Sequence, residues 1–134
     1  MIALFSKHPL ANKRALTIQD LQSLRLILYE KKTAMRRLID NFFNELGVTP
    51  QIAMVMENIE AIKSLVGAGL GASVLPAHAV GNDALDKKVR MIRVQKRTLR
   101  RQLGLVMLKS GLPPKAVHKL SQLIVNELRK KNAQ

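Results

Sequence analysis

Apolar residues recur every three or four positions in several segments, as they do along one face of an amphipathic helix. The clearest segment runs from Thr33 to Leu46, where Thr33 is a suitable N-cap and Gly47 supplies the stop. The same spacing returns in two later segments and, over a shorter length, in one earlier segment that begins at Thr17. The four predicted helices cover residues 17–23, 33–46, 58–66 and 113–131.

Short apolar runs of strand length alternate with these helices. The predicted strands cover residues 24–29, 51–56, 72–75, 89–95 and 99–108. Alternating helices and strands predict an α/β fold in which helices pack on a mixed or mostly parallel sheet. A chain of 134 residues is the size of one domain.

Three glycines between Gly67 and Gly71 could suggest a phosphate-binding loop. They do not have the spacing GxGxxG, and they follow a helix, whereas a dinucleotide-binding loop requires a strand, the glycines and then a helix. We therefore interpret this segment as a helix stop and a tight turn into the next strand. No other motif indicates a cofactor.

The residue types that carry enzyme chemistry are scarce. The absence of cysteine excludes disulfides, thiol nucleophiles and cysteine-ligated zinc, and it agrees with the reducing cytoplasm of a bacterium. His8, His78 and His118 are far apart and lie in no metal-ligand spacing, so we predict structural or solvent-facing histidines and no metal. No serine lies in a GxSxG motif and the carboxylates form no recognisable pair, so the sequence predicts a protein that is not an enzyme.

The charge is strongly positive, with 23 Lys and Arg against 9 Asp and Glu. Between Lys87 and Arg101, eight of fifteen residues are basic and none is acidic. This run is either a solvated strand face and turn or a patch that contacts a polyanion. It lacks the aromatic residues on which nucleic-acid bases stack. No apolar run approaches the length of a membrane span, so no membrane partner is expected.

Two strings of residues resemble the effector domain of LysR-type transcriptional regulators. His8-Pro9-Leu10-Ala11, followed by Thr17 to Leu21, is similar to the start of the second subdomain in that family. Glu57 to Pro76 (ENIEAIKSLVGAGLGASVLP) is similar to the helix, glycine turn and buried strand of the family, and the spacing between the two strings also fits. The resemblance implies a fold like that of the type 2 periplasmic binding proteins.

The resemblance also implies a division of the chain. Residues 8–98 would form a complete subdomain II, while residues 1–7 and 99–134 would form the C-terminal part of subdomain I. The winged helix-turn-helix that reads DNA in this family is expected to be absent from the chain. A partial subdomain would expose sheet edges and apolar helix faces, so we expect a homo-oligomer, either a dimer or a tetramer.

In this family a small molecule, often an organic anion, binds in the cleft between the subdomains. The effector-binding residues that the resemblance implies here are Lys32, Thr33, Ala34, Met35, Arg36, Met56 and Asn58. The free N–H groups and the dipole at a helix N-terminus favour a negative ligand, which agrees with this assignment. Equally, Thr33 and Asn58 can be plain helix caps and the basic side chains can be solvated. The family often has a hydroxyl residue near Ala34 and Met35, and this chain has none there.

Together, these observations predict the effector-sensing and oligomerisation module of a LysR-type regulator, which controls transcription through a DNA-binding part outside this chain. Two alternatives remain open at this point. One is a basic protein that associates with nucleic acid, and the other is an inactive regulator fragment.

Overall fold

The computed structural model describes residues 1–81, 86–100, 104–107 and 115–132. It divides into two units, residues 1–100 and 101–134. All six described strands belong to the first unit, and the described residues of the second include one long helix, α4 (Lys115–Asn132).

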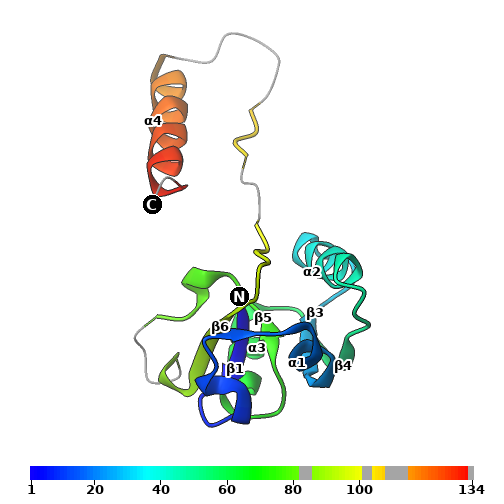
Figure 1. Cartoon of the computed structure of the whole chain (residues 1–134). Coiled ribbons are helices and arrows are strands. Elements are labelled where there is room, and N and C mark those ends of the chain that lie inside the picture. Colours follow the sequence, from blue (N-terminus) through cyan, green and yellow to red (C-terminus); the bar gives the residue numbers. More distant parts are fainter. Residues whose placement is uncertain (82–85, 101–103, 108–114, 133–134) are drawn as a thin grey trace. The chain divides into compact units, whose positions relative to one another are not determined.

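A mixed four-stranded sheet forms the centre of the first unit, in the order β2-β6-β1-β5 (Figure 1). The central strand β1 (Ile2–Phe5) pairs antiparallel with β5 (Ser73–Val74) and with β6 (Val89–Val94). The short strand β2 (Ala15–Leu16) runs parallel to β6. The sheet is therefore mixed, which is one of the two arrangements that the alternation of elements predicted.

A second sheet consists of two parallel strands, β3 (Arg25–Tyr29) and β4 (Gln51–Met56). An isolated bridge between Leu26 and Ala72 joins it to the first sheet, because Ala72 directly precedes β5. Ala72 accepts a hydrogen bond from Ile27 N at 2.7 Å, and its own N–H donates to the Arg25 carbonyl at 2.8 Å. The two sheets thus continue into one another.

Three helices of the first unit begin at side-chain caps that the sequence predicted. They are α1 (Ile18–Ser23), α2 (Ala34–Glu45) and α3 (Ile59–Gly67), and their caps are Thr17, Thr33 and Asn58. The described residues also contain three short 3₁₀ turns: η1 (Pro9–Asn12), η2 (Ala77–Ala79) and η3 (Asp86–Lys88).

The glycines after α2 and α3 have the structural roles that the sequence indicated. Gly47 has a φ angle of +64° and Gly69 has one of +78°, and residues other than glycine seldom adopt such angles. Gly71 has a different role, because a Cβ atom there would lie 2.9 Å from the Arg25 carbonyl oxygen. It allows the chain to approach β3 closely.

The hydrophobic core lies where the two sheets meet, and α3 packs against both β1 and β3. Its largest fully buried side chains are Phe43, Ile2, Leu4, Leu16, Leu21, Leu26, Ile27, Leu28, Ile39, Ile62, Leu75 and Val66. Nine of these twelve residues are apolar positions of the predicted helices and strands, whereas Ile2, Leu4 and Leu16 belong to β1 and β2, which were not among the predicted elements.

The prediction of a strand over residues 99–108 is wrong for the residues in that range that the structure describes. Residues 99–100 and 104–107 form no strand, while residues 101–103 and 108 lie outside the described chain. A strand is stabilised by hydrogen bonds to a neighbour, and no described strand pairs with these residues. The two prolines expected to open the last helix, residues 113 and 114, also lie outside the described residues, and α4 is described from Lys115. Among the described helices, none has the length and apolar character needed to cross a bilayer.

Candidate functional site

The two segments that were predicted to bind an effector lie at one edge of the β3–β4 sheet. Because these strands are parallel, their carboxyl ends lie side by side, and Tyr29 is the partner of Met56 in the register. Each strand is followed by a capped helix, α2 after Thr33 and α3 after Asn58. Ligand sites in open α/β sheets lie at this kind of edge, where helix N-termini follow the strands.

The hydroxyl group of Thr33 stabilises the start of α2 both as a hydrogen-bond acceptor and as a donor. Its Oγ1 accepts a hydrogen bond from Arg36 N at 3.1 Å and donates to the Glu30 carbonyl at 2.9 Å. The first N–H groups of a helix have no intrahelical acceptor. Within the described part of the chain, the N–H groups of Ala34 and Met35 have no hydrogen-bond partner, so this helix start offers two backbone donors.

Arg36 does not have the position expected of a residue that touches a ligand. It is 3% exposed, its Nε lies 2.8 Å from Asp40 Oδ1, and its Nη1 donates to the Tyr29 carbonyl at 2.9 Å. The guanidinium therefore ties the end of β3 to the first two turns of α2. Asp40 also offsets its charge. We assign Arg36 the role of holding the helix start in place.

Lys32 and Arg37 supply the positive charge that faces solvent at this helix start. Both side chains are exposed, and Arg37 Nη1 donates to the Lys32 carbonyl at 3.3 Å. Arg37 was not among the predicted site residues. The pair Arg36-Arg37 in the first turn was the available signal, but the sequence did not show which of the two would be buried.

Asn58 and Met56 form the second half of the edge. Asn58 Oδ1 accepts a hydrogen bond from Ala61 N at 2.8 Å, which is the ordinary role of an N-cap. Met56 is half-buried at the end of β4. Both residues thus have clear structural roles, and neither side chain has a described contact with the Thr33 segment.

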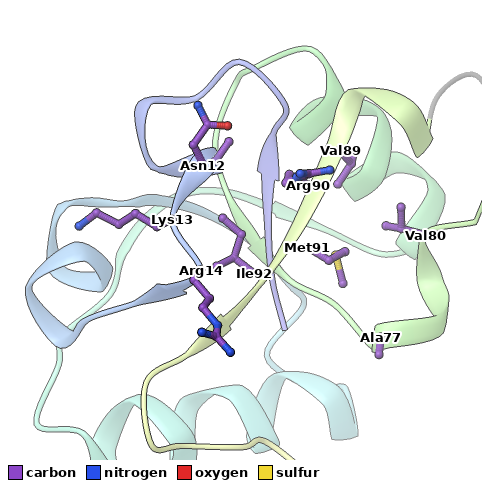
Figure 2. A pocket seen from close by; sticks show the side chains of 10 residues that line it. Asn12, Lys13, Arg14, Ala77, Val80, Val89, Arg90, Met91 and Ile92 are labelled. Atoms are coloured by element: carbon purple, nitrogen blue, oxygen red, sulfur yellow. The ribbon is translucent and has the colours of Figure 1, made fainter.

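Among the hollows of the described surface, two lie along β6, and none of the predicted effector residues lines either of these two. The first, of about 530 Å³, is drawn in Figure 2. Its rim includes Asn12, Lys13, Arg14 and Arg90.

The histidines have the structural or solvent-facing positions that were predicted. His8 Nδ1 accepts a hydrogen bond from Leu10 N at 3.1 Å and so caps η1. His118 lies on exposed α4 with its Nε2 3.0 Å from Gln122 Nε2, and His78 is exposed. In the described ranges, no three His, Asp or Glu residues gather as a metal site would require.

Comparison with known proteins identifies the family. The LysR substrate binding domain family matches residues 1–129, and the chain therefore belongs to that family. A probable RuBisCO transcriptional regulator of Phaeodactylum tricornutum is 29% identical over 126 residues, which are 92% of this chain and 40% of that protein. The chain thus spans about two fifths of the length of such relatives.

Solved structures agree with this assignment. HinK, a LysR family transcriptional regulator from Pseudomonas aeruginosa, superposes with a TM-score of 0.75 at 27% identity, over 97% of this chain and 43% of HinK. The regulatory domain of Synechocystis PCC6803 CcmR, solved in complex with 2-PG, gives a TM-score of 0.64 at 26% identity, over 70% of this chain and 45% of that domain. The fold is that of LysR effector-binding domains, which resembles the periplasmic binding proteins. This is a family of regulatory domains rather than of enzymes.

Proposed function

We propose that this chain is the effector-sensing part of a LysR-type regulator and that it binds a small organic anion at the edge formed by β3 and β4. The observation that carries the proposal is the pair of unpartnered backbone donors, Ala34 N and Met35 N, at the start of α2. In the sequence they lie between two exposed cations, Lys32 and Arg37. Backbone N–H groups at the positive end of a helix dipole, with cations beside them, favour a carboxylate or a phosphate.

A regulatory domain of the same fold, that of CcmR, was solved with a small molecule bound, which supports a ligand-binding role for this chain. Following the resemblance, we assign residues 8–98 to subdomain II and residues 1–7 and 99–134 to part of subdomain I. In this proposal the ligand changes the geometry of subdomains or subunits, and a DNA-binding part of the regulator responds in the cytoplasm.

The experiment is a binding titration of the purified chain against a panel of small carboxylates and phosphates. Sulfate at the same ionic strength controls for unspecific charge effects. One class of anion should raise the temperature of the thermal transition in a saturable way, because a ligand that binds only the folded state stabilises it.

A single substitution tests the position of the anion. Ala34→Pro removes one N–H donor from the first helical position, where proline is favoured. Thr33 has φ −76° and ψ 146°, the extended conformation that a residue before proline prefers. We expect affinity to fall about tenfold or more, since a hydrogen bond to a charged group contributes about 1.5–3 kcal/mol.

The matched control is Ile18→Pro at the first position of α1. Ile18 is exposed, and Thr17 before it has φ −85° and ψ 172°, so the backbone before this proline is extended as well. This variant should bind like the unchanged chain. Equal affinities in both proline variants would place the anion elsewhere. If sulfate stabilises the chain as much as every organic anion does, the chain does not sense an effector at this edge and behaves as an inactive fragment.

A further inference from the structure

A second positively charged surface, which the effector proposal does not use, lies along β6. We call it the β6 basic surface, and its cationic side chains line the two hollows along β6. These side chains are Lys13, Arg14, Arg90, Arg93 and Lys96. All five residues are exposed.

The fold assembles this surface from two distant parts of the sequence. The parallel pairing of β2 with β6 sets Ala15 opposite Arg93, and Gln95 N donates to the Leu16 carbonyl at 2.9 Å. Lys13 and Arg14, which directly precede β2, thereby come beside the basic run that starts at residue 87. The pairing therefore extends a charge cluster that the sequence shows only in part.

Few negative charges oppose these cations. No carboxylate is among the residues that line the two hollows. Lys13 Nζ pairs with Asp20 at 2.8 Å, so its charge is partly offset. Within the described residues, Arg14, Arg90 and Arg93 form no salt bridge.

The cations surround the hollow without converging on one point in it. In Figure 2 the side chains of Lys13, Arg14 and Arg90 point in three different directions. A small anion would contact only one of them at a time. Arg90 and Arg93 are about 10 Å apart along β6 and leave opposite faces of this strand, because side chains alternate along it. A polyanion as broad as a duplex, in contrast to a small anion, would reach cations on both sides of the strand.

We propose that the β6 basic surface binds the sugar–phosphate backbone of duplex DNA. A regular polyanion neutralises dispersed cations and releases its own counterions, which drives binding without reading sequence. Single-stranded nucleic acid is bound on aromatic platforms, and no aromatic residue lines the two hollows. The chain belongs to a family of transcriptional regulators, so DNA is the polyanion it encounters. This surface shares no residue with the proposed effector edge, so the two proposals can fail independently.

The test measures binding of a labelled duplex of arbitrary sequence to the purified chain by fluorescence anisotropy over a range of salt concentrations. Four or five phosphate contacts predict that log K falls with log salt at a slope of about −4. The substitutions Arg90→Gln, Arg93→Gln and Lys96→Gln together should make this slope shallower by about 2.7 and weaken binding at 0.1 M salt by more than tenfold.

The control is the triple variant Arg25→Gln, Lys115→Gln and Lys119→Gln. It also removes three positive charges, all exposed and outside both the β6 basic surface and the proposed effector edge. The control should keep most of the slope, and both variants should keep the thermal transition of the unchanged chain. An equal loss in both triple variants would show an effect of net charge alone and overturn the proposal. Two other results would also overturn it. One is displacement of the duplex by an equal concentration of a polyglutamate of equal charge, and the other is an absence of duplex binding at 0.05 M salt.

Discussion

Replacing Gly71 with alanine should destabilise the chain strongly, because the two sheets meet there. An added Cβ atom would lie 2.9 Å from the Arg25 carbonyl oxygen and 2.9 Å from Ile27 Cγ1, closer than real Cβ atoms approach their neighbours. The segment around Gly71 must move away from β3, which stretches the two hydrogen bonds, of 2.7 and 2.8 Å, that Ala72 makes with β3. Overpacking costs about 1–3 kcal/mol and each weakened hydrogen bond up to about 1 kcal/mol, so we expect a loss of about 2–4 kcal/mol.

Urea denaturation measures this loss as a shift of the midpoint with little change of slope. Two other glycines separate the effect of space from that of backbone conformation. At Gly47 nothing lies within 4 Å but φ is +64°, so alanine should cost about 1–2 kcal/mol. At Gly104 neither constraint exists, and alanine should change stability by less than about 0.5 kcal/mol. If Gly71→Ala is no more harmful than Gly47→Ala, the close approach of the chain to β3 is not what requires glycine at position 71.

Two further predictions concern α1 and the edge of β4. The hydrogen bond and charge of Lys13, together with the bonds to Thr17, hold the pKa of Asp20 below its usual 3.8, despite the opposite effect of partial burial. This carboxylate therefore stabilises the fold above pH 3.8, so Asp20→Asn should cost about 1 kcal/mol at pH 7. That difference should vanish as acid protonates Asp20 through its lowered pKa, and a difference that persists in acid would contradict this. Ile52 and Val55 are 43% and 48% exposed on β4, which pairs only with β3 among the described strands. We expect copies of the chain to associate through this exposed apolar edge. Val55→Lys should then lower the mass of the particle in sedimentation, while the free energy of unfolding stays within about 0.5 kcal/mol. An unchanged mass would exclude this edge as the contact between copies.

The sequence predicted most elements because their ends are marked by local chemistry. The helix expected from Thr33 to Leu46 is found as Ala34–Glu45, since a hydroxyl cap and Gly47 fix both ends within a few residues. The strand β2 has no such signal, because its two residues are strand only through their bonds to β6, far along the chain. The failed strand prediction at residues 99–100 and 104–107 has the opposite cause: the composition of a strand was present, but no described strand pairs with these residues.

The candidate site was predictable in its position and less so in its chemistry. Parallel strands followed by capped helices indicated where Thr33 and Asn58 would lie, since that geometry follows from the order of the elements. Which arginine of α2 faces solvent depends on packing, because the helix turns about 100° per residue and Asp40 and Tyr29 fix Arg36 inside. The β6 basic surface was visible only as a basic run, since Lys13 and Arg14 join it through strand register.

The distribution of the core decides what these experiments report. Every buried apolar residue of the described chain lies between Ile2 and Ile92, within the first unit. Five large apolar side chains of α4, by contrast, are exposed, from 36% at Leu128 to 57% at Leu120. Because cooperative unfolding requires a shared core, the thermal and urea transitions should report on the first unit. The effector edge and the β6 basic surface both belong to that unit, so a ligand that binds either of them should raise the transition, whatever the contacts of α4.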